Sequence, residues 1–215
     1  MDALVSYRYH QVVDEICHLQ WQSLTPDEMI AVAHAYYYFS IQFRENLQIA
    51  RSLYPSDEKL LQLEDGECNT DNLSPWPGIA ATGERMNHDE FMRRTLDLAS
   101  IDGGSAAHFR ATGEAYLEHV RARDHFSRAL SIASYEDGGL ESVFRAILRF
   151  ESWDNAPLRA FQHFLVEHIR FDSDPDEGHG ALCRHLPPDD RVVVFWEAFR
   201  DILIDCVPGL AGRLS

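Results

Sequence analysis

The sequence is poor in positive charge, and above all in lysine. Nineteen Lys and Arg residues stand against 35 Asp and Glu residues, which gives a formal net charge of −16, and Lys59 is the single lysine. An acidic surface repels the phosphates of nucleic acids and of anionic lipids. We therefore expect neither duplex nucleic acid nor a membrane surface as the main partner, and Lys59 is the one candidate for Schiff-base chemistry.

Cysteine pairs, long apolar runs and a leader sequence are also missing. The four cysteines contain no CxxC pair, so we expect reduced thiols and neither a disulfide framework nor a zinc finger. No apolar run approaches the 18 residues that a membrane span needs. The first residues lack the basic-then-apolar order of a secretory signal. These absences predict a soluble, cytoplasmic protein.

Strand patterns are absent as well, because apolar residues recur at helical spacing almost throughout. A chain of 215 residues fits one domain, so we expect a single all-α domain over residues 1–215, a bundle of about seven to eight helices. The helix start at Thr25 is the clearest, since Pro26 and Glu28 follow it in the pattern of a capping box. The first six expected helices cover about residues 7–22, 26–54, 56–69, 88–99, 105–135 and 140–150. The next helix begins at Asp154 as its cap and carries His168. The last helix runs from about residue 189 to residue 207.

One long irregular segment, residues 70–87, interrupts this pattern. It contains two prolines and two glycines as helix breakers, with Trp76 between Pro75 and Pro77. Loops of this length in a compact domain are usually functional or disordered. We expect either an ordered lid or wall over a functional site, or a surface excursion packed by Trp76.

The segment FQHFLVEHIRFDSDPDEGHG (161–180) carries the strongest chemical pattern. His168 and Asp172 are four residues apart, so on a helix they lie one turn apart on the same face. His179 follows after the helix breakers Pro175 and Gly178. Imidazoles and a carboxylate that meet at one point form the mixed nitrogen and oxygen ligand set of non-haem iron.

Further candidate ligands lie upstream. Glu64 and Glu67 share a helical face that ends beside the 70–87 segment, and His88 begins the next expected helix. Glu136 interrupts an apolar stretch just before Gly138 and Gly139. In helical bundles such side chains project inward from facing helices to hold a pair of metal ions.

Taken together, these residues resemble the haem-oxygenase-like di-iron oxidases and oxygenases, which are haem-free helical proteins that bind two irons and activate O2. The resemblance covers about residues 60–185. It implies a haem-oxygenase-like helical bundle and a ligand set of Glu67 (or Glu64), His88, Glu136, His168, Asp172 and His179.

Two spacings depart from the family's pattern. On an unbroken helix His179 would lie about 16 Å along the axis from His168, so the chain has to bend near Pro175 and Gly178. The separation between Glu67 and His88 is also longer than in the family, because the 70–87 segment intervenes. Asp71, four residues after Glu67, is the alternative to His88.

The resemblance implies an O2-dependent oxidoreductase with two Fe(II)/Fe(III) ions and O2 as co-substrate. It would oxidise a small amino-acid-like or fatty-acid-like molecule by N-oxygenation or oxidative C–C cleavage. The electrons would come from the substrate or from an external donor, because no reductase motif is present. The oligomeric state is open, and a homodimer is compatible with the sequence.

Two other hypotheses remain at this point. One is a metal-free enzyme on the same fold, either a thiaminase-like hydrolase with Cys68 beside Glu67 as nucleophile, or a cofactor-independent oxidase. The other is a non-catalytic helical interaction module, in which His168 and Asp172 are ordinary polar surface residues. Metal dependence separates the di-iron hypothesis from both.

Overall fold

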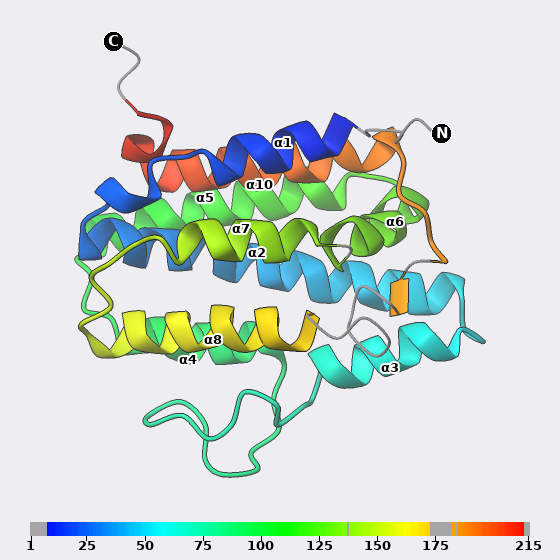
Figure 1. Cartoon of the computed structure of the whole chain (residues 1–215), viewed down its shortest axis with the longest axis horizontal. Helices are drawn as coiled ribbons and strands as arrows, with labels where there is room; N and C mark the ends of the chain where they lie inside the picture. The colour runs from blue at the N-terminus through cyan, green and yellow to red at the C-terminus, as the bar shows by residue number, and fades with distance from the viewer. Residues whose placement is uncertain (1–7, 137, 173–181, 184, 213–215) are drawn as a thin grey trace.

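The computed structural model describes residues 8–136, 138–172, 182–183 and 185–212 (Figure 1). Within these ranges the chain forms helices and no strands, and its β-type pairing is limited to two isolated bridges, Thr70–Met86 and Trp76–Ala80. The all-α class predicted from the sequence is confirmed. No helix in the described part is long and apolar enough to cross a membrane.

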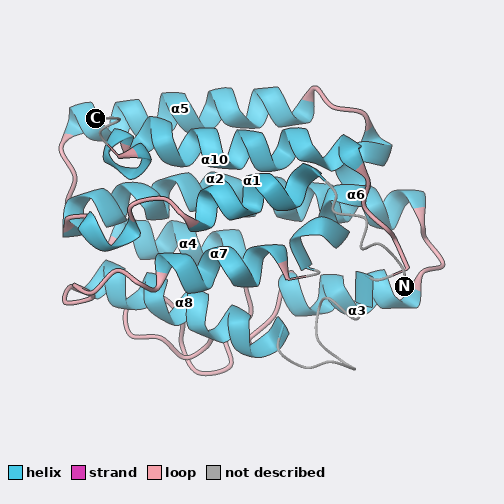
Figure 2. Cartoon of the chain, turned by 45° about the horizontal axis from the view of Figure 1, so that its top comes forward, coloured by secondary structure: helices cyan, strands magenta, loops and turns pink. Residues whose placement is uncertain are grey.

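The α-helices run roughly along one axis, and a long segment between α3 and α4 protrudes from them (Figures 1 and 2). Their bounds are α1 Arg8–Cys17, α2 Pro26–Leu53, α3 Glu58–Glu67, α4 His88–Asp97, α5 Gly103–Arg121, α6 His125–Glu136, α7 Gly139–Ile147, α8 Ala156–Asp172 and α10 Val193–Cys206. Three short 3-10 helices are η1 Trp21–Ser23, η2 Asp190–Val192 and η3 Pro208–Ala211.

The long helix α2 is the centre of the bundle. It begins as predicted, with Pro26 in its first turn and a full capping box. The Glu28 amide donates to Thr25 Oγ1 over 3.3 Å, and the Thr25 amide donates to Glu28 Oε2 over 2.8 Å. Helices α3, α4, α5, α6, α8 and α10 all contact α2. A residue on α2 can therefore face almost any other part of the fold.

Several local predictions were wrong. The described part of the chain contains nine α-helices and not seven to eight, and the first expected helix, residues 7–22, ends at Cys17. The expected helix over 105–135 is two helices, because Asp124 ends the run: its carboxylate accepts from the Ser127 amide at 2.9 Å and from the Ser127 hydroxyl at 2.7 Å. Such a side-chain cap favours a new helix start over continuation. The cap of α8 is Asn155, which accepts from the Leu158 amide at 2.9 Å, and not Asp154.

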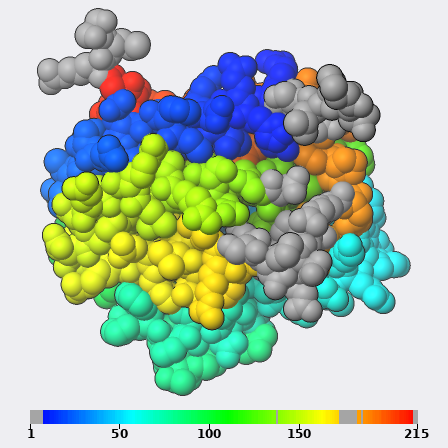
Figure 3. All heavy atoms as spheres, viewed as in Figure 1, coloured from blue at the N-terminus to red at the C-terminus, as the bar shows by residue number. Residues whose placement is uncertain are grey.

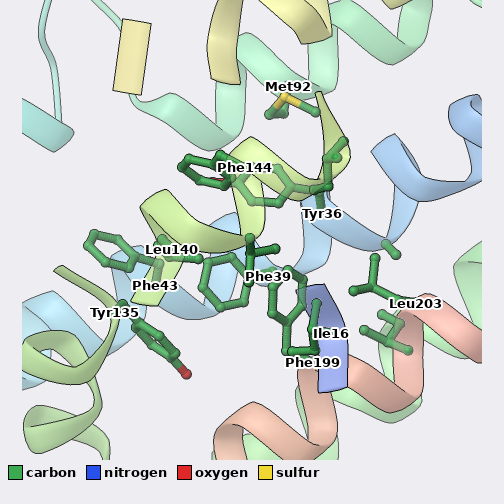
Figure 4. Packing of buried hydrophobic residues seen from close by; sticks show 14 of the residues in the cluster. Ile16, Tyr36, Phe39, Phe43, Met92, Tyr135, Leu140, Phe144, Phe199 and Leu203 are labelled. Atoms are coloured by element: carbon green, nitrogen blue, oxygen red, sulfur yellow. The ribbon is translucent and has the colours of Figure 1, made fainter. Parts of the chain in front are cut away.

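Aromatic side chains fill the centre of the core. Tyr36 of α2 lies edge-on to Phe144 of α7, Phe164 of α8 and Phe199 of α10, with ring centroids 5.3–6.3 Å apart. Figure 4 shows Tyr36, Phe39, Phe144 and Phe199 meeting from three helices. Edge-on contacts of this kind add to the burial of apolar surface. The core thus ties α2, α7, α8 and α10 together next to His168, which stacks on Phe164 at 4.0 Å.

The segment between α3 and α4 protrudes beneath α8 on the face shown in Figure 3. It is not an open loop, because Thr70 and Met86 exchange backbone hydrogen bonds of 3.0 and 2.9 Å at its base. Leu73, Ile79 and Met86 are buried. Its Trp76 stacks on His163 of α8 with ring centroids 4.3 Å apart. We name residues 68–87 the brace.

A buried imidazole on α2 makes a testable contribution to acid sensitivity. Burial lowers the pKa of His34 from 6.5 to about 4, and the ring stacks on Phe109 at 4.8 Å. The unfolded chain takes up this proton below about pH 6.5 and the folded chain only near pH 4. The His34 contribution is therefore absent at pH 7, and it lowers the free energy of unfolding as the pH falls from 6.5 toward 4.

The free energy of unfolding falls in both proteins between pH 7 and pH 4.5. We expect this fall to be about 2 to 3 kcal/mol smaller in the His34→Phe variant than in the wild type. Urea unfolding at both pH values measures this difference. Equal losses in the two proteins would show that His34 is not held neutral by the fold.

Candidate metal centre

Three helix segments bring Glu67, His88 and His168 together. Glu67 is the last residue of α3, His88 is the first residue of α4, and His168 lies in α8. Their exposed fractions are 6%, 4% and 6%. Helices α4 and α8 pack against each other, and all three helices contact α2 (Figure 1). Polar side chains buried this deeply need strong partners to offset their lost hydration.

The base of the brace explains why Glu67 and His88 meet despite their separation in the sequence. The Asn69 amide donates to Asn87 Oδ1 over 2.9 Å, just above the Thr70–Met86 bridge. These contacts hold the end of α3 beside the start of α4. The long spacing that departs from the family's pattern is thus taken up by the protruding brace.

The three side chains point their polar atoms at one another. His88 Nδ1 lies 2.7 Å from Glu67 Oε2 and 2.9 Å from His168 Nε2. One ligand atom from each residue can be chosen so that all three lie within 4.8 Å of one another. Atoms bound to one metal ion at about 2.1 Å are separated by roughly 3 to 4 Å. The cluster has the dimensions of a metal-ligand set.

Contacts on the far side of each ring define which nitrogen carries a proton. His168 Nδ1 donates to the Phe164 carbonyl over 2.8 Å, so Nε2 of the neutral ring presents a lone pair. On the other ring, His88 Nε2 lies 3.0 Å from Asn72 Oδ1. Asn72 Nδ2 donates to the Gly66 carbonyl over 2.8 Å, which turns the amide oxygen toward His88. His88 therefore donates through Nε2, and Nδ1 of its neutral ring presents a lone pair.

Two ring nitrogens and a carboxylate oxygen thus face the same point, and a positive charge there would be attracted to all three. A proton on His88 Nδ1 can make a linear hydrogen bond to Glu67 or to His168, but not to both. A metal ion could bind all three atoms at once. Histidine ligands that donate their other N–H to a carbonyl or amide oxygen are typical of metal sites. The donor set fits a divalent transition metal.

Glu136, the last residue of α6, also lines the small cavity beside the cluster. The cavity has a volume of about 20 Å³, the space of one or two water molecules or ions. Glu136 is 6% exposed but does not belong to the cluster of mutually close ligand atoms. Two ionised carboxylates, Glu67 and Glu136, would balance the charge of one divalent ion.

Most of the remaining cavity wall is formed by apolar side chains and by one ion pair. Tyr36, Phe43, Leu140 and Phe164 form its apolar part. Arg44 and Asp89 line it as a pair whose Nη2 and Oδ2 atoms lie 2.9 Å apart, with two further contacts from Arg44 Nε to the carboxylate. The other lining residues are Ser40 and Cys68. Such surroundings keep the local dielectric constant low and strengthen the attraction between a cation and its ligands.

The remaining predicted ligands have separate outcomes. Asp172 is the last residue of α8, while its side chain and the whole of His179 lie outside the described residues. The bend predicted near Pro175 and Gly178 also falls outside them. The structure places Glu67 rather than Glu64 in the cluster, because Glu64 instead pairs with Arg51 at 3.3 Å.

Asp71, the alternative to His88, is exposed and does not line the cavity. His88 itself occupies the place between Glu67 and His168. The reason is that Asp71 directly follows the Thr70–Met86 bridge at a position where its side chain is exposed, whereas His88 begins α4 beside the end of α3.

Cys68 also borders the cavity. Burial, together with the negative charges of Glu67 and Glu64, raises the pKa of its thiol to about 12. A cysteine nucleophile needs a lowered pKa, because the thiolate is the reactive form. The surroundings of Cys68 are thus the opposite of those of a catalytic thiol.

Two groups that orient the histidines were not found by sequence reasoning. They are Asn72, which accepts from His88, and the Phe164 carbonyl, which accepts from His168. The second has a sequence signal, since a carbonyl four residues before a helical histidine is always within reach. Asn72 has none, because its place depends on the path of the brace.

Comparison of the chain with protein-family models, with curated proteins and with solved structures gives no match.

Proposed function

We propose that this chain is a haem-oxygenase-like, haem-free iron enzyme that uses O2 to oxidise a small organic molecule. The observation that carries the proposal is the convergence of three buried basic atoms, Glu67 Oε2, His88 Nδ1 and His168 Nε2. Two imidazoles with a carboxylate form the ligand set typical of non-haem iron that reacts with O2. The proposed cofactor is a pair of iron ions, with Glu136, Asp172 and His179 as the further ligands.

Iron would supply the redox chemistry, by passing electrons to O2 while the substrate is oxidised. The side chains have separate tasks around it. His88 and His168 would bind through Nδ1 and Nε2, the ring nitrogens opposite those that contact the Asn72 and Phe164 oxygens, in fixed ring orientations. Glu67 and Glu136 would neutralise the metal charge inside an apolar wall. Phe164, stacked on His168 at 4.0 Å, excludes water from that ring.

The proposed substrate is a small amino-acid-like or fatty-acid-like molecule, and the proposed reaction is N-oxygenation or oxidative C–C cleavage. The electrons that O2 requires would come from this substrate or from an external donor. In the conformation described, the cavity beside the cluster has room for ions and water only. Substrate would therefore enter next to this cavity after a rearrangement of its wall.

The experiment that tests the proposal follows O2 uptake after anaerobic loading with Fe(II). We expect the loaded protein to consume O2 at least about tenfold faster than the same Fe(II) in buffer, with a transient absorbance change on mixing. The Glu67→Gln variant is expected to react like free Fe(II). Equal rates for wild-type protein, variant and buffer would contradict an O2-activating centre.

The two other hypotheses are less consistent with these observations. A thiaminase-like hydrolase would need a reactive Cys68, whose pKa is raised to about 12. An interaction module would leave the histidine pattern as polar surface, whereas His168 is 6% exposed. A cofactor-independent oxidase would not need three basic atoms around one point.

A further inference from the structure

The brace contacts every helix that carries a member of the cluster. Asn72 Nδ2 donates to the carbonyl of Gly66, the neighbour of Glu67 at the end of α3. Asn72 Oδ1 accepts from His88 at the start of α4. On α8, His163 lies 3.2 Å from the Leu73 carbonyl and stacks on Trp76, one and a half turns before His168. One segment thus links α3, α4 and α8.

The brace is internally fixed, so it can transmit this positioning. The Arg94 guanidinium of α4 donates to the Ile79 carbonyl and to Glu84 Oε1, both over 2.8 Å. Glu84 also accepts from the Ala81 amide over 2.8 Å. The Gly83 amide donates to Ser74 Oγ over 3.1 Å. These bonds, both within the brace and from the brace to α4, fix the segment as part of the fold.

Within the brace, Asn72 is the residue on which the His88 ring depends. Its side-chain amide contacts both the Gly66 carbonyl and the His88 ring, and the orientation of the amide is set by both contacts together. The Gly66 carbonyl accepts only from a donor, so it holds the NH2 group on the α3 side. The amide oxygen is then left for His88 Nε2–H. A histidine proton at Nε2 leaves Nδ1 free to bind metal, toward Glu67 and His168.

We propose that Asn72 is a positioning residue for the metal centre: it fixes the proton of His88 on Nε2 and thereby aims Nδ1 at the metal. This role rests on the proposed metal-binding function. The segment predicted as a lid is, on this view, part of the metal site's support. Residues that orient metal-bound histidines typically change metal affinity by 10- to 100-fold when they are replaced.

Two variants separate orientation of His88 from simple anchoring of the brace. Asn72→Leu removes both bonds of the amide. Asn72→Asp is nearly isosteric and keeps an oxygen acceptor for His88, but it has no donor for the Gly66 carbonyl. Anchoring through Gly66 is thus lost in both variants, whereas the acceptor for His88 is lost only in the leucine variant.

Two measurements are made on wild type and both variants. The first is ¹⁵N NMR of the histidine rings in metal-free protein at pH 8.5, which reports the protonated nitrogen of His88. The second is a titration with Zn²⁺ as a diamagnetic, redox-inactive probe. We expect a protected His88 Nε2–H in wild type and Asn72→Asp, and its loss in Asn72→Leu. Zn²⁺ affinity should fall about 10- to 100-fold in Asn72→Leu and by no more than a few-fold in Asn72→Asp.

Equal Zn²⁺ affinities in the two variants would overturn the proposal, because only anchoring would then count. A wild-type His88 that carries its proton on Nδ1 would overturn it as well. If the Nε2–H signal is present but neither Zn²⁺ nor Fe(II) binds wild-type protein, the metal function itself fails and the positioning role falls with it. That outcome differs from the first two, in which wild-type protein binds metal.

Discussion

The Glu67→Gln variant is expected to bind Fe(II) at least about 100-fold more weakly than the wild type, a loss of about 3 kcal/mol or more in binding free energy. Glutamine keeps the shape of the side chain but removes the negative charge that lies 2.7 Å from His88 Nδ1. In a buried site that charge is screened little by water. Anaerobic equilibrium dialysis with Fe(II), followed by iron analysis, measures the difference.

Glu64→Gln is the matched control for this variant. Glu64 lies three residues earlier on α3 and pairs with Arg51 at 3.3 Å, away from the cluster. We expect its Fe(II) affinity to stay within a few-fold of the wild type. The reverse result, weak binding by Glu64→Gln and normal binding by Glu67→Gln, would move the metal centre to the other acid of this helical face.

Loading with metal is expected to raise the thermal midpoint of unfolding by about 5 to 10 °C when free Fe(II) is 100 times its dissociation constant. Binding to the folded state alone then adds about 2.7 kcal/mol. In a chain of this size each kcal/mol moves the midpoint by roughly 2 to 4 °C. Anaerobic calorimetry with Fe(II) and with a chelator measures the shift.

The same scan on Glu67→Gln gives the internal reference. At that Fe(II) concentration the variant should show a shift of less than about 2 °C, because its site would be at most half occupied and binding would add no more than about 0.4 kcal/mol. Equal shifts in both proteins would mean that iron stabilises the fold from some other place, such as the acidic surface.

Both the Fe(II) affinity and the rise in the thermal midpoint depend on the free-energy cost of burying the cluster without an ion. Two imidazoles and a carboxylate, each about 5% exposed, have lost most of their hydration. Hydrogen bonds to Asn72 and to the Phe164 carbonyl satisfy the outer nitrogens. The inner atoms face one another. A cation bound at that point is therefore stabilised more strongly than it would be at an exposed site.

Sequence reasoning predicted the helices where local chemistry decides the structure. The capping box at Thr25 and the apolar spacing of α2 are complete within the segment itself. The break at Asp124 was missed, because an acid inside an amphipathic pattern is as compatible with a surface position as with a cap. Asn155 and Asp154 are adjacent capping residues, and only the backbone path selects between them.

The candidate site was predicted only in part from the sequence. The residue types and their order pointed to Glu67, His88 and His168 through a family resemblance, and the structure places these three together. The choice between Glu67 and Glu64 depends on which way α3 is turned, and the sequence left it open. Asn72 could not be found from the sequence, because its role arises from a brace that leaves the bundle and returns.

Anaerobic Fe(II) stoichiometry of the wild-type protein tests the central claim most directly. The account predicts two irons per chain retained after dialysis, lost in parallel when Glu67 is replaced by glutamine. A single iron would keep the Glu67–His88–His168 cluster as a binding site and overturn the di-iron proposal. No iron above the level of the Glu67→Gln variant would contradict the account as a whole.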